Sequence, residues 1–434
     1  MIETIKVIGA GLAGVEAAWQ CANAGFKVEL YEMKPKKYSP AHKMPTFAEL
    51  VCSNSLKAKR VESAAGLLKE EMRRFGSLCV ECAYETEVAA GGALAVDRDE
   101  FSKLVTEKIL SHKNITVINE EVTEIPEGNV IIAAGPLASD ALSEKISSLC
   151  GNGLHFFDAA APIVTADSID KECSFAASRY DRGGDDDYIN CPMNKEEYEA
   201  FYEALINAES ADLHSFDKRK DVYEGCMPIE VMASRGADTM RFGPLKPVGL
   251  RDPRTGHRPW AVLQLRKENN SGTMYNLVGF QTNLKFGEQK RVFSLIPALK
   301  NAEFVRYGVM HRNTFIDSPR LLDGDFSFRK RENLFFAGQI TGVEGYMESA
   351  ASGIMAGYNM VKRLKGEETL VLPEITMIGA LSRYISDESV ANFQPMGANF
   401  GVLPPIEPKI RDKKERYAAL SERALKALEN SVKF

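Results

Sequence analysis

A short apolar strand, a glycine-rich turn and a helix follow one another at the start of this chain, and this feature constrains the fold most. The turn has the spacing G-x-G-x-x-G and consists of Gly9, Ala10, Gly11, Leu12, Ala13 and Gly14. The first glycine permits a tight bend, the second lets backbone approach a pyrophosphate, and the third lets helix pack against strand. The pattern predicts a dinucleotide-binding, Rossmann-like unit; the alternative is an ordinary strand–loop–helix connection.

The segment after the turn fits the same unit. We expect a helix over residues 12–24 that ends at Gly25 and directs its positive N-terminus at the pyrophosphate. A second strand, Lys27 to Tyr31, runs directly into Glu32. An acidic residue at that place typically binds the ribose of the dinucleotide. We therefore predict that residues 9–14 and Glu32 bind a cofactor.

A second glycine-rich segment lies near position 340. A strand predicted over 334–337 leads into Gly338, Gln339 and Gly342, and a helix of small residues follows. Together the two segments indicate FAD, and we expect these three residues to contact it. The chain has no second G-x-G-x-x-G, so we expect NAD(P)H to reach the flavin through an open substrate face.

Composition excludes several classes of protein. The 434 residues are 44% hydrophobic, which predicts roughly two or three domains with well-filled cores. No apolar run approaches the roughly 18 residues of a membrane span, and the first residues lack the pattern of a signal peptide. The formal net charge is −6, so a nucleic-acid partner would need a local basic patch.

The cysteines indicate reduced thiols in a cytoplasmic protein. The eight are scattered along the chain: Cys21, Cys52, Cys79, Cys82, Cys150, Cys173, Cys191 and Cys226. Without a paired C-x-x-C pattern we expect no metal site. Cys79 and Cys82 form a single C-x-x-C, which is either a redox pair or two incidental thiols.

The order of elements predicts an α/β fold: a Rossmann-like FAD-binding domain of the glutathione-reductase type with an inserted α+β domain. We expect the FAD-binding domain over 1–138, the inserted substrate domain over 139–320, a return to the first domain over 321–365, and a C-terminal extension over 366–434. The change at about 139 is marked by frequent turns and short strand-like pieces.

Six long segments carry a resemblance to a known family. They are FAELVCSNSLKA (47–58), GCMPIEVMASRG (225–236), TMRFGPLKPVGLRDPRTGHRPWAVLQLR (239–266), MYNLVGFQTNLKFGEQKRVF (274–293), EFVRYGVMHRNTFIDSP (303–319) and FFAGQITGVEGYMESAASG (335–353). In these segments the chain resembles the folate- and FAD-dependent tRNA uracil-5-methyltransferases. The resemblance implies transfer of a methylene from 5,10-methylenetetrahydrofolate to carbon 5 of a T-loop (T-arm) uridine, with electrons from NAD(P)H through FAD.

The resemblance also implies roles for individual residues. Cys226 matches the nucleophile that adds to carbon 6 of uracil, and Cys52 matches a second functional cysteine, an acid–base group or a methylene handler. Tyr346 is expected to pack near the isoalloxazine ring; the alternative is a core aromatic. At Asn283 the chain departs from family members, which often carry a histidine there that is thought to stack on folate.

The stretch 241–266 is a candidate tRNA surface, because it holds six basic residues against one acidic residue. The basic C-terminal segment around Lys409 to Arg416 is a second candidate. A solvated charged surface is the alternative for both. We expect neither membrane attachment nor a stable protein partner. Two other functions stay open: a FAD-dependent oxidoreductase of small molecules, and a tRNA-binding flavoprotein without catalysis.

Overall fold

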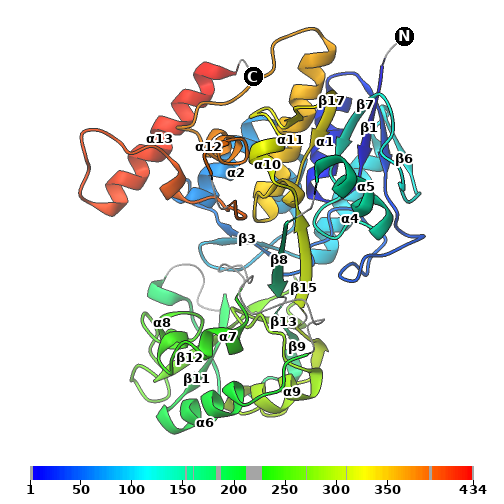
Figure 1. The fold of residues 1–434 in the computed structure, drawn as a ribbon. Coiled ribbons are helices and arrows are strands. Elements are labelled where there is room, and N and C mark those ends of the chain that lie inside the picture. The colour runs from blue at the N-terminus through cyan, green and yellow to red at the C-terminus, as the bar shows by residue number, and fades with distance from the viewer. Residues whose placement is uncertain are drawn as a thin grey trace.

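The computed structural model describes residues 3–151, 154–159, 161–181, 187–211, 227–269, 271–308, 310–390 and 393–432. It forms two domains joined by a narrow connection, with the first and last parts of the chain in one domain and the middle part in the other (Figure 1). Cys226, the predicted nucleophile, lies outside the described residues.

The first domain is built on a sheet of six strands in the order β16-β17-β7-β1-β2-β6. Its strands are β1 (Thr4–Ile8), β2 (Lys27–Tyr31), β6 (Ile115–Ile118), β7 (Asn129–Ile132), β16 (Ser327–Phe328) and β17 (Arg331–Phe336). All neighbours run parallel except the edge strand β16. Because β17 pairs with β7, the chain returns to its first sheet after the insertion, as the sequence predicts.

Helices cover this sheet and a small sheet beside it. The helices are α1 (Leu12–Asn23), α2 (Ala64–Arg74), α3 (Leu78–Glu85), α4 (Arg98–Ser111), α5 (Asp140–Cys150), α10 (Ser318–Leu321), α11 (Tyr346–Leu364), α12 (Met377–Tyr384) and α13 (Lys413–Ser431). The small sheet has β5 (Ala93–Val96) between β3 (Ser55–Ala58) and β4 (Glu87–Val88). The charged helix α13 buries Leu420, Ala424 and Leu428 in the first core.

The small residues of α11 let it lie directly against α1. A Cβ atom on Gly353 would come within 2.1 Å of the Ala13 carbonyl oxygen, and one on Gly357 within 2.7 Å of that of Ala17. Both separations are far below a van der Waals contact, so only glycine permits this helix spacing. The contact fixes α11 behind the glycine-rich turn.

The inserted domain is a second, antiparallel sheet in the order β10-β11-β12-β13-β9-β14. Its strands are β9 (Ile163–Thr165), β10 (Phe175–Ala176), β11 (Tyr188–Met193), β12 (Ala261–Lys267), β13 (Met274–Leu277) and β14 (Phe304–Arg306). Helices α6 (Lys195–Ile206), α7 (Ile229–Ala233), α8 (Thr239–Phe242) and α9 (Phe286–Phe293) accompany it. Strand β13 ends at Leu277, and the chain then turns through Gly279, whose φ is +78°.

An antiparallel pair of strands, β8 (Leu154–Ala159) and β15 (Met310–Phe315), connects the domains (Figure 1). Leu142 and Ile146 of α5 belong to the core of the first domain. We therefore propose that the inserted domain begins at β8 and ends at β15, inside the range 139–320. In the described part of the chain no helix is long and apolar enough to cross a membrane.

Candidate functional site

A pocket opens at the carboxyl ends of β1 and β7, where ligands bind in open α/β sheets. Nine of the residues expected to bind FAD line it: Gly9, Ala10, Gly11, Leu12, Ala13, Glu32, Gly338, Gln339 and Tyr346. Gly14 and Gly342 do not. A Cβ on Gly14 would lie 1.7 Å from the Gly9 carbonyl oxygen, and Gly342 has a φ of +83°. These two glycines shape the walls of the pocket.

The glycine-rich turn leaves room for a pyrophosphate. Gly11 is the N-cap of α1, without a side chain that caps the helix, and a Cβ placed on it would meet no atom within 4 Å. The first N–H groups of α1 therefore lie beside open pocket space, which is the arrangement that binds phosphate. On this observation the residues fit the expected FAD.

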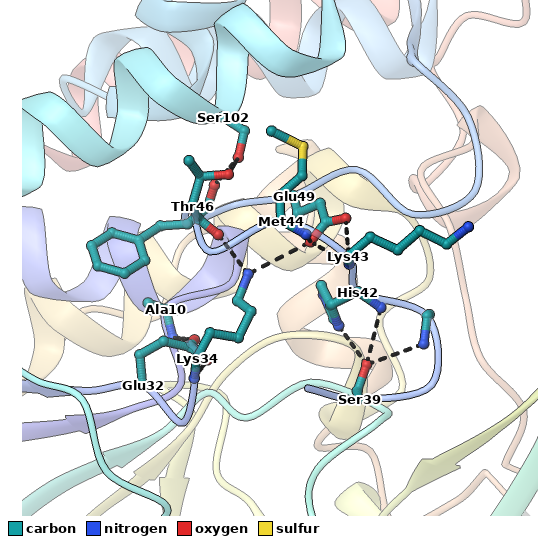
Figure 2. Close-up of polar contacts among 12 residues, drawn as sticks. Ala10, Glu32, Lys34, Ser39, His42, Lys43, Met44, Thr46, Glu49 and Ser102 are labelled. Atoms are coloured by element: carbon teal, nitrogen blue, oxygen red, sulfur yellow. Dashed lines mark hydrogen bonds and ion pairs between the residues drawn. The ribbon is translucent and has the colours of Figure 1, made fainter. Parts of the chain in front are cut away.

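Glu32 holds the turn in place through both of its carboxylate oxygens. Oε2 accepts a hydrogen bond from the Ala10 backbone N–H and Oε1 accepts one from the Lys34 N–H, both at 2.9 Å (Figure 2). Each carboxylate oxygen retains a further lone pair for a ribose hydroxyl. The predicted cofactor residue is therefore also a structural brace of the turn.

Lys34 was not among the predicted site residues, yet it lies buried in the pocket wall. Its ammonium group donates to the Thr46 carbonyl and lies 3.7 Å from the Glu49 carboxylate (Figure 2). Burial lowers the pKa of Lys34, while Glu32 and Glu49 act against that shift. The proline-punctuated basic segment after Glu32 was the sequence signal for it.

Cys52 belongs to a loop, residues 50–54, here called the Cys52 loop, whose backbone is held by surrounding side chains. The Tyr346 hydroxyl oxygen accepts hydrogen bonds from the N–H groups of Cys52, at 2.7 Å, and Ser53, at 3.2 Å. Tyr346 also lines the pocket. Burial and then the charge of Cys52 raise the pKa of Tyr346. The predicted thiol loop therefore adjoins the predicted flavin pocket.

Three arginines that sequence reasoning did not assign to this site also hold the Cys52 loop. Arg98 donates to the Leu50 carbonyl at 2.7 Å, and Arg306 donates to the Val51 carbonyl. Arg266 donates to the Ser53 hydroxyl at 2.8 Å. They come from positions far apart in the chain, so no local motif could have grouped them.

Described residues on either side of Cys226 bond to residues 281–283. The Ala211 N–H donates to the Asn283 carbonyl at 2.8 Å, and the Ile229 N–H donates to the Gln281 carbonyl at 2.7 Å. The Asn283 N–H donates to the Glu230 carboxylate, and its side-chain amide donates to the Ala211 carbonyl. Asn283 therefore bonds to Ala211 through its side chain and to Glu230 through its backbone.

Cys79 and Cys82 are buried on α3, in the core of the first domain. Burial raises the pKa of the Cys79 thiol well above its usual value and that of Cys82 to about 12. A thiol that stays protonated and inaccessible is a poor redox group, so the geometry favours the incidental thiols. The described residues include no cluster of His, Cys, Asp or Glu able to hold a metal ion.

Only part of the basic stretch 241–266 is available to a partner. Arg266 is buried against the Cys52 loop, which contradicts a role in contacting phosphate. Arg254 pairs with Asp252 at 2.7 Å, and Arg241 stacks on the Trp260 ring with its guanidinium carbon 3.7 Å from the ring centroid. Arg251, His257 and Arg258 remain exposed, in the loop before β12.

Comparison with known proteins agrees with this geometry. The chain is 62% identical over 434 residues to "Methylenetetrahydrofolate--tRNA-(uracil-5-)-methyltransferase TrmFO" of Acetivibrio thermocellus, covering 100% of this chain and 99% of that one. It is 58% identical over 426 residues to the TrmFO of Enterococcus faecalis, covering 98% of each. The chain belongs to the TrmFO family. The resemblance found in the sequence is thereby confirmed.

A family model described as "Glucose inhibited division protein A" also matches residues 4–368 of the chain. Among solved structures, Aquifex aeolicus GidA superposes with a TM-score of 0.70 at 17% identity, over 99% of this chain and 77% of that one. This likeness concerns the fold alone and confirms the expected α/β, Rossmann-like architecture. The family match supports FAD as the cofactor of this chain.

Proposed function

We propose that this protein methylates carbon 5 of a uridine in tRNA with the one-carbon unit of 5,10-methylenetetrahydrofolate, using FAD. The observation that carries the proposal is the contact of Tyr346 with the Cys52 backbone, at the wall of the pocket that fits FAD. A thiol beside a flavin suits a reaction in which a thiolate activates uracil and a flavin supplies the electrons. The relatives that share about three-fifths of this sequence are named for this activity.

The residues that would hold FAD are those of the pocket. Gly9, Gly11 and the start of α1 would hold the pyrophosphate, Glu32 would bind the ribose, and Gly338, Gln339 and Tyr346 would surround the flavin end. When bound, FAD supplies the two electrons that convert a methylene to a methyl group. The chain itself orients the substrates and moves the protons.

We assign the nucleophile to Cys226, on the strength of its motif. Its thiolate would form a bond to carbon 6 of the uracil, which makes carbon 5 nucleophilic toward the methylene carbon. As carbon 5 bonds to the methylene carbon, the bond from that carbon to the folate nitrogen would break, so that tetrahydrofolate leaves and the proton on carbon 5 is lost. Transfer of two electrons as hydride to the methylene carbon, with cleavage of the sulfur–carbon bond, would then give the methyl group, restore the ring and release the thiolate. Cys52 would accept or return a proton, or hold the one-carbon unit.

Exposed Arg251, Arg258 and Trp260 support a tRNA surface on the inserted domain. Strand β12 runs from the neighbourhood of Trp260 to Arg266 at the Cys52 loop, a path of about 20 Å at the rise of an extended strand. A tRNA T-arm that presents its uridine to the thiols could place phosphates on this loop. We expect the enzyme to work in the cytoplasm, where it meets tRNA.

We infer that NAD(P)H supplies the electrons. With one dinucleotide fingerprint, which FAD would occupy, the nicotinamide is expected at the face that folate later occupies. The two would then bind in turn. Folate should compete with NAD(P)H during flavin reduction.

Incubation with unmodified tRNA, methylenetetrahydrofolate labelled in its methylene carbon, and NAD(P)H tests the function. The expected product is 5-methyluridine that carries the label, formed only when all three substrates are present. If NAD(P)H reduced the flavin but no label entered the tRNA, the result would favour a small-molecule oxidoreductase. Binding of tRNA without product, unaffected by loss of both cysteines, would favour a non-catalytic tRNA-binding protein.

A further inference from the structure

Contacts between the two domains converge on the Cys52 loop, which belongs to the first domain. From the inserted domain, Arg306 reaches the Val51 carbonyl, and Arg266 reaches Ser53 and Asn54. In return the Asn54 side-chain amide donates to the Lys267 carbonyl at 2.9 Å. The position of this loop therefore depends on how the inserted domain sits against the first.

The peptide unit that precedes Cys52 is held at both ends. Its carbonyl, on Val51, accepts the hydrogen bond from Arg306, and its N–H, on Cys52, donates to the Tyr346 hydroxyl. Because a peptide unit is planar, fixing its carbonyl and its N–H fixes its plane. The plane in turn fixes the position of the Cys52 Cα atom, from which the side chain leaves the backbone.

Arg306 lies among charged groups that the two domains bring together. Arg98 of the first domain forms a buried ion pair with Glu268 of the inserted domain. Burial is the main influence on the Arg306 guanidinium and lowers its pKa, and the charges of Arg98, Tyr346, Cys52 and Glu268 act on it as well. The guanidinium is thus near the thiol as well as bonded to the neighbouring carbonyl.

We propose that Arg306 is a positioning residue for the Cys52 thiol, so that correct docking of the inserted domain aligns the thiol with the pocket. The proposal rests on the function assigned to Cys52 above. Arginine suits this role because its rigid planar fork fixes the direction of the bond it donates, whereas lysine provides a point charge on a flexible stem. The Cys52 thiol would then be aligned for its reaction only when the inserted domain is docked correctly on the first domain.

Arg306→Met tests the proposal in the full-length, flavin-loaded protein, with Arg291→Met as a matched control on α9. Arg291 pairs with Glu288 on the surface of the inserted domain. In Arg306→Met we expect kcat to fall by about 100-fold, a loss typical of a displacement near 1 Å, with KM for tRNA and folate within about twofold. Arg306→Lys should recover part of kcat, and Arg291→Met should match the parent.

A second readout is independent of methylation. The rate of Cys52 alkylation by iodoacetamide, followed by mass spectrometry of the Cys52 peptide, should change at least about fivefold in Arg306→Met, because the orientation of the thiol changes. Unchanged kcat and alkylation in Arg306→Met would overturn the proposal, even if its melting temperature fell. If Arg306→Met lost flavin, Arg306→Lys would decide by the same criteria. If Cys52→Ala methylates normally, the function assigned to Cys52 is wrong, and alkylation alone decides whether Arg306 positions the thiol.

Discussion

The hydroxyl oxygen of Tyr346 lies 2.7 Å from the backbone nitrogen of Cys52, so one tyrosine joins the flavin pocket to the predicted catalytic loop. Tyr346 is the first residue of α11, directly after the second glycine-rich segment. Its ring is part of the pocket wall, while its hydroxyl group reaches the loop. The sequence predicts that the Tyr346 ring packs near the flavin, but it carries no signal for the contact of the hydroxyl group with Cys52.

Removing only that hydroxyl, in Tyr346→Phe, should leave two partly buried N–H groups without their acceptor. We expect FAD to stay bound, the unfolding free energy to fall by about 1–2 kcal/mol, and methyl transfer to slow. Absorbance spectra, urea denaturation and a methylation assay measure the three effects. Tyr384→Phe, which removes the hydroxyl contacts to the Gln394 carbonyl and N–H, is the control and should leave methyl transfer unchanged.

Two neighbouring glycines should respond in opposite ways to a side chain. Gly11→Val points into open pocket space and should give folded but colourless protein, because the side chain occupies the pyrophosphate position. Gly14→Ala would bring its Cβ within 1.7 Å of the Gly9 carbonyl, and should lower the melting temperature sharply. A fully yellow Gly11→Val protein would contradict the placement of FAD.

Substitutions of the two cysteines that we propose as functional should separate binding from chemistry. Cys226→Ala should retain flavin and bind tRNA with parental affinity but form no 5-methyluridine, because uracil activation requires the thiolate. Cys52→Ala should be severely impaired, and Cys150→Ala, at the end of α5, should behave as the parent. Robust methylation by Cys226→Ala would rule that residue out as the nucleophile.

The exposed arginines before β12 should govern the salt dependence of tRNA binding. The sequence suggests testing Arg251 and Arg254, but Arg254 is already paired with Asp252, so Arg258 is the better partner for Arg251. Arg251→Ala with Arg258→Ala should flatten the plot of log affinity against log salt by about one unit for each lost phosphate contact. Arg291→Ala should not change the slope; an unchanged slope in the double variant would place tRNA elsewhere.

Glu71 should make folding stability depend on pH. Burial raises its pKa from the usual 4.5 to about 7, although its carboxylate accepts hydrogen bonds from the Met377 and Ile378 N–H groups at the start of α12. A raised folded-state pKa gives stability that is full below about pH 4.5 and is lost as pH rises through about 7. The unfolding free energy of the parent relative to Glu71→Gln should therefore drop by up to roughly 3 kcal/mol between pH 5 and pH 8. Urea denaturation at both pH values measures it, and a constant difference would contradict this assignment.

Much of the first domain could be predicted because its signals are local. The strand, turn, helix and second strand up to Glu32 form as expected. The return strand β17 was predicted from its apolar run and the glycines after it. The helix of small residues expected after Gly342 forms as α11, and it packs on α1 through Gly353 and Gly357.

The surroundings of Cys52 could not be predicted, because they assemble from distant parts of the chain. Arg98, Arg266 and Arg306 meet only when the inserted domain docks on the first. In the sequence Arg266 is one of several basic residues in a stretch, and nothing local separates a buried loop clamp from an exposed phosphate contact. Only the folded structure, in which Arg266 is buried, separates these two roles.

The pocket takes its walls from residues 8–13, near the start of the chain, and from residues that include Gly338 and Tyr346, far along it. A nascent chain leaving the ribosome therefore carries the fingerprint long before it can hold a flavin. Cofactor capture has to wait until α11 has emerged and settled on α1. A chain truncated before β17 would carry only half of the dinucleotide site and would not bind flavin. The yellow colour of a cell extract would therefore come only from chains whose synthesis had passed β17.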